Sequence, residues 1–252
     1  MQLKILNLNI WQGGNLFTEV VDFIKRQGPD ILILQEVYNG VDPALPNKYR
    51  TYTELKEELG FSGSHFAPAF LDNRAEGKIE SGNAIYSQFP ILSGTSTFYD
   101  IPYNDSYVEV RENFPTTPRN LQSVVVDIGQ GQLNVFNTQG IWGEDGGDSD
   151  RRLLMGESIS QAVKDKGNVI LAGDFNCNPG TKTIQKIEKH LTNVFGRELP
   201  STFNMKHKAE GGYATAVVDM IFVSKEFTVV SKTCHDDDVS DHRALSVVVE
   251  LK

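Results

Sequence analysis

Cysteine is scarce in this 252-residue sequence, and that scarcity narrows the class of protein. The two cysteines, Cys177 and Cys234, lie far apart and form no CxxC pair, so the sequence argues against a zinc cluster. Because disulfides are rare in the cytosol, we expect two reduced thiols, with a single disulfide between them as the alternative.

Long apolar runs are also absent. No stretch reaches the roughly eighteen consecutive apolar residues that a membrane-spanning helix needs. The N-terminal segment MQLKILNLNIW is too short and too polar for a secretory signal. We therefore expect a cytoplasmic protein without a constitutive membrane anchor.

Positive charge is in deficit. Lys and Arg number 24 against 33 Asp and Glu, which gives a net charge of −9. A broad groove for a long polyanion needs many basic side chains, so this balance argues against one. It does not exclude a nucleic acid held at a single metal site, because a bound divalent cation reverses the local field.

The remaining composition, 39% hydrophobic and 23% charged, is typical of a globular domain. No internal linker is visible, so we predict a single domain over residues 1–252. Periodicity predicts helices over 16–26, 53–59, from Asp148 or Ser149 to about 164, and 181–190. Strand patterns cover 3–10, 31–34, 83–86, 91–98, 121–128, 133–137, 169–172, 217–223, 227–232 and 244–251.

About a dozen strands and four helices indicate an α/β protein of stacked sheets with helices outside. In the third helix, Leu154, Ile159 and Val163 are expected to form the apolar stripe. The polar stretch 100–118 carries three prolines and is predicted to be a long loop. This loop, with 140–148 and 200–213, is expected to select the substrate, and Trp142 either stacks on a ligand or packs under its loop.

Four strand-like segments end in polar side chains. This is unusual for apolar strands unless those polar groups contact a ligand or one another. Asn7 and Asn9 share one face of the first strand, because side chains alternate along a strand. The other three segments lead into Glu36, into Asp174-Phe175-Asn176, and into Asp241-His242. Taken singly, each has an ordinary interpretation as an edge, a solvated or a turn residue.

Asp219 is harder to explain as an ordinary residue. It lies in VVDMIFV (217–223), where both strand faces are apolar, so the strand is predicted to be covered on both sides. An ionised carboxylate in such a place is costly unless it is paired. His242 is the natural partner, and an Asp–His pair suits acid/base or phosphate-binding work.

The candidate ligands are all oxygen donors, carboxylates and amides. Such a set suits a hard cation, Mg²⁺ or alternatively Mn²⁺, rather than zinc. A metal of this kind polarises a phosphoryl oxygen and steadies a leaving oxygen.

Seven short motifs spread over almost the whole chain combine these residues. In this order they resemble the endonuclease/exonuclease/phosphatase superfamily, which includes DNase I-like nucleases. The resemblance implies a four-layer αββα sandwich of two packed mixed β-sheets flanked by helices. The motifs are LNLNIW (6–11), LQEV (34–37), SGNAIYS (81–87) with FPI (89–91), FNT (136–138), GDFN (173–176), VDMIF (218–222) and SDH (240–242).

The resemblance also implies a metal site and a base. Glu36 is expected to be the main metal ligand, with Asn9 and Asp241 nearby. Asp174 corresponds to the base or the orienter of the attacking water, and Asn176 to the amide that holds the phosphate or the nucleophile.

The remaining roles concern the phosphate. His242, oriented by Asp219, is expected to bind the phosphate and stabilise the transition state. Asn83 and Asn137 are expected to be supporting or substrate-side amides. Arg119 is a further candidate for the phosphate because a guanidinium suits that task, with a surface charge as the alternative.

One position departs from the family pattern. Many members have Asn-Thr-His where this chain has Asn137-Thr138-Gln139. Gln139 can donate a hydrogen bond to a substrate but cannot transfer a proton at neutral pH. General-acid catalysis at this position is therefore in doubt.

The sequence predicts a metal-dependent hydrolase of phosphate esters, either a phosphodiesterase or a phosphatase. Its substrate would be a small molecule, a nucleotide, a lipid head group or a short nucleic acid. The alternatives are a nuclease acting on short nucleic acid, a catalytically impaired binding module on the same fold, which Gln139 would permit, or a purely structural protein.

Overall fold

The computed structural model describes residues 1–208 and 216–252. One sheet contains β1 (Gln2–Asn9), β2 (Ile31–Asn39), β3 (Gly63–Arg74), β4 (Gly77–Ser87), β6 (Asn104–Tyr107), β12 (Phe227–Cys234) and β13 (Leu245–Leu251). The other contains β5 (Ile91–Phe98), β7 (Asn120–Asp127), β8 (Gln132–Gln139), β9 (Val169–Asp174), β10 (Thr192–Asn193) and β11 (Asp219–Val223). The orders are β12-β13-β1-β2-β4-β3-β6 and β10-β11-β9-β8-β7-β5.

Both sheets are mixed, because β1 runs parallel to β2 and β8 parallel to β9 among otherwise mostly antiparallel neighbours. Alternating side chains give central strands such as β1 and β9 two buried faces. Leu3 and Ile5 of β1 enter the core between the sheets, together with Val135 of β8, whereas Leu6 and Leu8 face the helices.

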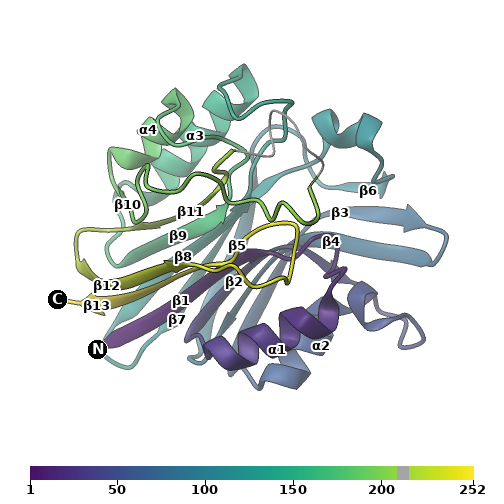
Figure 1. Ribbon diagram of the computed structural model, residues 1–252, viewed down its shortest axis with the longest axis horizontal. Coiled ribbons are helices and arrows are strands. Elements are labelled where there is room, and N and C mark those ends of the chain that lie inside the picture. The colour runs from purple at the N-terminus through teal and green to yellow at the C-terminus, as the bar shows by residue number, and fades with distance from the viewer. Residues whose placement is uncertain (209–215) are drawn as a thin grey trace.

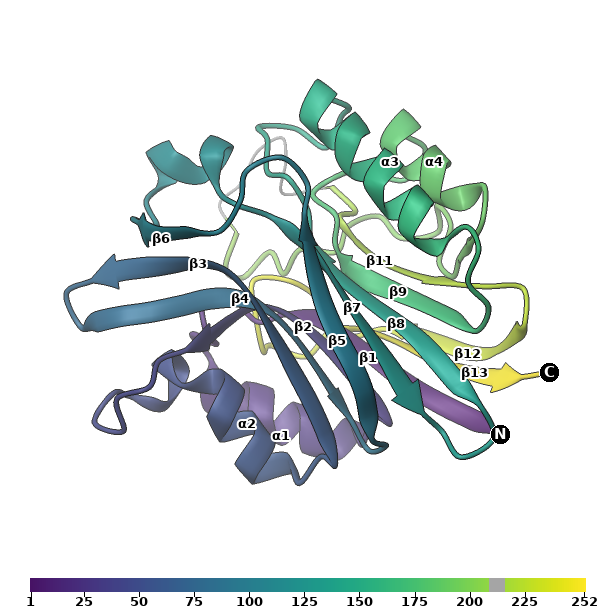
Figure 2. The same ribbon diagram turned by 180° about the vertical axis from the view of Figure 1, so that it is seen from behind.

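The helices are α1 (Phe17–Gln27), α2 (Thr51–Leu59), α3 (Asp150–Val163) and α4 (Lys182–Glu188), with short 3₁₀ turns η1 (Asn47–Tyr49) and η2 (Arg111–Thr116). Figures 1 and 2 show α1 and α2 against the outer face of the first sheet, and α3 and α4 against the outer face of the second. The result is a four-layer αββα sandwich, which confirms the predicted fold. No helix in the described ranges is long and apolar enough to span a membrane.

The helix ends follow the sequence signals. Helix α1 ends at Gly28, which adopts φ 54° and donates its backbone N–H to the carbonyl of Ile24. Helix α3 begins after Ser149, whose hydroxyl accepts from the backbone N–H of Arg152. The expectation for Leu154 was wrong: its side chain is 46% exposed, because Met155 takes the inward position beside Ile159.

Two segments differ from the prediction. Strand β3 is long but was missed, because its inward and outward residues mix polar and apolar types and give no clear period. The stretch 100–118 is not a plain loop, since it contains β6 and η2. Strand β6 is short and pairs in parallel with β3, a tertiary contact that local composition does not reveal.

Candidate active site

The ends of five strands meet at one edge of the two sheets. Strand pairing places Asn9 beside Gln35, and it places both Gln139 and Asp219 beside Asp174. A cavity of about 220 Å³ opens there. Its described lining consists of Trp11, Gln12, Glu36, Glu109, Phe114, Arg119, Gln139, Trp142, Asp174, Asn176, Phe203, Lys208, Asp241 and His242.

Glu36 reaches this cavity because of a β-bulge. The pairing of β2 with β4 shifts by one residue between Leu34 and Val37, and Glu36 adopts the left-handed region with φ 58°. Its Oε2 accepts from the backbone N–H of Gln12 at 2.8 Å, and its Oε1 accepts from Gln139 Nε2 at 2.8 Å. The bulge therefore turns a carboxylate into the pocket and neighbouring donors hold it there.

Asn9 lies beneath the cavity rather than in its lining. Its Nδ2 donates to Glu36 Oε1 at 3.0 Å and to Asp174 Oδ2 at 3.2 Å, while its Oδ1 accepts from the backbone N–H of Trp11. This fully buried amide orients two carboxylates. Its position suits that orienting role, and the expectation that Asn9 also helps to hold a metal stays a prediction.

Asp174 is the last residue of β9, and Asn176 follows it in a tight turn. Asp174 Oδ1 accepts from the backbone N–H of Asn176 at 2.9 Å, and Asn176 adopts φ 53°. The Asn176 amide donates to the carbonyl of Gly140 at 3.1 Å. Burial raises the pKa of Asp174, and although His242 opposes this, the carboxylates of Asp219 and Glu36 add to it. An acid with a raised pKa, lining a cavity, suits work as a general base.

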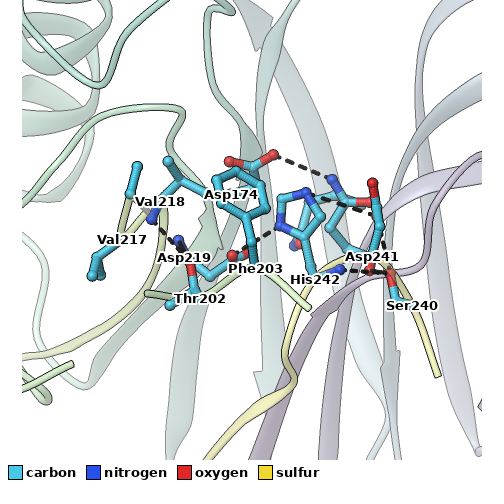
Figure 3. A network of polar contacts seen from close by, with 12 residues as sticks. Asp174, Thr202, Phe203, Val217, Val218, Asp219, Ser240, Asp241 and His242 are labelled. Atoms are coloured by element: carbon cyan, nitrogen blue, oxygen red, sulfur yellow. Dashed lines mark hydrogen bonds and ion pairs between the residues drawn. The ribbon is translucent and has the colours of Figure 1, made fainter. Parts of the chain in front are cut away.

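His242 lies between two carboxylates (Figure 3). Its Nδ1 is 2.9 Å from Asp219 Oδ2, and its Nε2 is 4.0 Å from Asp241 Oδ1. Burial alone would lower the pKa of His242, but the charges of Asp219 and Asp241 raise it to about 9. A pKa in this range favours the charged ring at neutral pH, and a charged ring attracts an anionic phosphoryl group.

Asp219 was predicted to lie within a strand over 217–223. In the structure it is the first residue of β11. Its side chain is nonetheless fully buried, and its backbone N–H donates to Thr202 Oγ1 at 3.2 Å. Asp219 does not line the cavity and acts on it through His242.

Lys208 was not among the predicted site residues. Its Nζ is 2.5 Å from Asp241 Oδ2 and 4.8 Å from the centre of the Phe203 ring. Burial would lower the pKa of Lys208, but Asp241 raises it. Lys208 belongs to the loop 200–213 that was expected to select the substrate, and residues 209–213 of that loop lie outside the described part.

Arg119 lines the cavity, so its alternative interpretation as a surface charge was wrong. The guanidinium donates through Nη1 to Gln139 Oε1, and its buried Nε has no hydrogen-bond partner among the described residues. Burial lowers the pKa of Arg119, although Glu36 and Glu109 oppose this. An unsatisfied buried N–H of this kind is costly unless a ligand accepts its hydrogen bond.

Asn83 and Asn137 were expected to be supporting or substrate-side amides, and the structure places both behind the cavity. Asn137 donates to the carbonyls of Leu34 and Ala84, and Asn83 donates to Asn120 Oδ1 at 3.1 Å. Both side chains are buried between the sheets. They support the strand ends instead of lining the pocket, because their amides satisfy backbone carbonyls there.

The sequence analysis missed Glu109 and Phe114, which line the cavity from the segment 100–118. Trp142, for which two roles were left open, lines the cavity and contacts Phe114, with ring centres 5.8 Å apart and an interplanar angle of 69°. No motif surrounds Glu109 or Phe114. Only the general expectation of a functional loop pointed to them.

The residues present fit a single hard cation. Within 1–208 and 216–252, no three His, Cys, Asp or Glu side chains converge as a ready-made metal site. Mg²⁺ is usually held by one or two carboxylates together with substrate phosphate, so this is no obstacle. The described lining also holds more acidic than basic side chains, and a divalent cation would make such a pocket attractive to an anion.

The sequence matches the model of the endonuclease/exonuclease/phosphatase family over residues 6–242. The chain therefore belongs to this family of phosphoester hydrolases, which confirms the resemblance. No curated protein gives a significant match.

Solved structures agree on the fold. An endonuclease/exonuclease/phosphatase from Beutenbergia cavernae has a TM-score of 0.72 at 20% identity, covering 99% of this chain and 72% of its own. A mannosyl-6-phosphatase from Bacteroides thetaiotaomicron has a TM-score of 0.69 at 18% identity, over 99% and 100%. TDP2 from D. rerio, complexed with a single-strand DNA product, has a TM-score of 0.72 at 14% identity, over 99% of each chain.

Proposed function

We propose that this protein hydrolyses phosphate esters with the help of a divalent metal ion, Mg²⁺ or Mn²⁺. The observation that carries the proposal is the convergence of Glu36, Asp174 and the charged His242 on one cavity. Arg119, with its unpartnered Nε, supplies a further donor for an anion.

Each of these residues has a separate role in the proposed reaction. Glu36 would hold the metal, with Asp241 as a second carboxylate, and the metal would polarise the phosphoryl oxygen. Asp174 accepts a proton from the attacking water. His242 donates a hydrogen bond from Nε2 to the phosphoryl group and stabilises the negative charge that develops there.

Hydrolysis of two generic esters tests the proposal. We expect release of p-nitrophenol from bis(p-nitrophenyl) phosphate or p-nitrophenyl phosphate, only with Mg²⁺ or Mn²⁺, and its loss in Asp174→Ala. The ratio between the two esters separates a phosphodiesterase from a phosphatase. Metal-independent release, or full activity in Asp174→Ala, would contradict the proposal.

Metal binding has a second readout that needs no turnover. A ligand that binds only the folded state raises stability, by about 2.7 kcal/mol at a concentration 100 times its Kd. We expect Mg²⁺ to raise the Tm of the wild type and to have a much smaller effect on Glu36→Gln. Equal shifts in both proteins would remove Glu36 as the ligand. A folded protein that binds Mg²⁺ but hydrolyses no ester would favour the binding-module alternative.

A further inference from the structure

A second charged cluster borders the cavity, built from residues that the proposed chemistry does not use. Arg74 in β3 forms an ion pair with Asp72 and donates through Nη2 to Glu109 Oε2 at 2.8 Å. Tyr38 in β2 donates to the same oxygen at 2.6 Å. The backbone N–H of Glu109 donates to Asp72 Oδ1 at 3.1 Å. Three contacts thus fix Glu109, although it lies between β6 and η2.

The cluster contains more acid than base. Arg74 lies 4.8 Å from the centre of the Tyr38 ring, and it is the cation that both Asp72 and Glu109 pair with. The side chains of Asp72 and Glu109 are only 3% and 11% exposed. Burying two carboxylates around one guanidinium is costly. Such an arrangement is expected where the surplus carboxylate has a ligand to bind.

Glu109 has one oxygen left for such a ligand. Tyr38 and Arg74 both donate to Oε2, and within the described ranges no donor reaches Oε1. Glu109 lines the cavity together with Glu36 and Arg119. Burial and the charge of Glu36 raise the pKa of Glu109, whereas Tyr38 and Arg74 oppose this and favour the ionised form. In that form the oxygen accepts a hydrogen bond from a hydroxyl or an amine, or binds a cation, but an ionised phosphate oxygen has no proton to donate to it.

The surroundings favour a hydroxyl. Arg74 and Arg119 already place two cations near Glu109, and the proposed metal beside Glu36 adds a third positive charge. Phe114 and Trp142 add an aromatic wall to the same cavity. Apolar walls with one fixed polar group are the usual means of orienting a small ligand. A sugar or polyol offers both apolar C–H faces and hydroxyl donors.

We propose that Glu109 selects phosphate monoesters whose alcohol is a neutral sugar or polyol, by accepting a hydrogen bond from one of its hydroxyl groups. A second phosphate at that end would offer only acceptor oxygens to Glu109, so such a substrate is disfavoured. This inference rests on the proposed function, since it assumes that the phosphate binds beside Glu36, Arg119 and His242.

The test compares esters that differ only in the alcohol: glucose 6-phosphate, n-hexyl phosphate, glucose 1,6-bisphosphate and ethanolamine phosphate. We expect the wild type to prefer glucose 6-phosphate to n-hexyl phosphate by about 10- to 100-fold, the range for one hydrogen bond to a charged group. Glu109→Gln should remove most of this preference, mainly through KM, and improve the relative use of the bisphosphate. Asp105→Asn, which changes an exposed carboxylate of β6, is the matched control and should keep the wild-type ratios.

Two further measurements separate the possible failures. The dissociation constants of glucose 6-phosphate and n-hexyl phosphate, measured by calorimetry on Asp174→Ala with Mg²⁺, give the same selectivity without turnover. If this ratio is unchanged by Glu109→Gln, or if ethanolamine phosphate is preferred, the inference is wrong, whether or not p-nitrophenyl phosphate is hydrolysed. If selectivity depends on Glu109 but no ester is hydrolysed, the proposed function fails and the binding preference stands. Should Glu109→Gln not fold, Glu109→Asp, which keeps the charge but withdraws the oxygen, should show the same loss of preference.

Discussion

Two charged groups border the cavity, and they differ in what they hold. In one, Asp219 and Asp241 face His242, so two acids surround a group that carries a positive charge toward the substrate. In the other, Arg74 is enclosed by Asp72 and Glu109, so a cation is buried and an acid faces the cavity. The first group presents both the charged His242 and the carboxylate of Asp241 to the cavity, whereas the second presents only the carboxylate of Glu109. A phosphate needs the cation and a hydroxyl-bearing alcohol needs the acceptor, so the difference indicates which end of an ester lies where.

The largest effect on the rate is expected for Asp174, because its proposed role as the base is the same for every ester, whatever the alcohol. Asp174→Asn keeps the shape but removes the base, and loss of a general base typically costs about 10² to 10⁴ in rate. We expect this fall in kcat on every ester, with little change in the ratio between esters. A fall confined to hydroxylated esters would contradict the division between the two groups.

The next effect concerns the pair formed by Asp219 and His242. Removing one partner of a buried pair costs roughly 3–5 kcal/mol, because the other charge is left uncompensated. Asp219→Asn should lower the free energy of unfolding by about that amount, measured by urea denaturation, and reduce kcat on all esters. Glu58→Gln, which breaks the exposed ion pair with Lys25, is the control and should cost no more than about 1 kcal/mol.

A smaller effect is expected in the second group. Tyr38→Phe removes one hydrogen bond to Glu109 Oε2 and leaves Arg74 as the remaining donor to that oxygen. We expect the preference for glucose 6-phosphate over n-hexyl phosphate to fall by up to about tenfold, while kcat on p-nitrophenyl phosphate stays within a factor of about three. Equal losses on both substrates would show that Tyr38 supports the whole cavity.

The smallest effect is expected at Gln139, which lies between the two groups and binds both Arg119 and Glu36. Because Gln139 cannot protonate a leaving group, wild-type turnover should be slower on poor leaving groups than on activated esters. Gln139→His should narrow this gap by a few-fold. Unchanged rates on both kinds of ester would show that no proton is transferred from this position.

The sequence predicted the first group and not the second, for a physical reason. Asp219 and His242 were recognisable because a carboxylate inside an apolar strand demands a partner, and few histidines are available. No charged residue inside an apolar strand gave a similar signal for Asp72, Arg74 and Glu109. Their meeting depends on the parallel pairing of β6 with β3, which no local pattern encodes.

The same distinction applies to the fold. The layers followed from apolar periodicity, since strands such as β1 and β9 have buried faces on both sides. The boundaries of the elements and the strand β3 could not be predicted from periodicity, because they depend on how neighbouring strands pair in register. Asn83 and Asn137 resembled site residues in sequence, yet the depth at which their amides end, behind the cavity, is a property of the packed sheets.

The orientation of Glu36 depends on the one extra residue that the bulge adds to β2. Between Leu34 and Val37 the strand advances three residues while its partner β4 advances two, from Ala84 to Gly82. Deleting Gln35 would restore the regular ladder and place Glu36 directly after Leu34, so its side chain would face the core between the sheets, because Leu34 faces the helix layer. Insertions and deletions at this point should therefore be tolerated far less than conservative replacements.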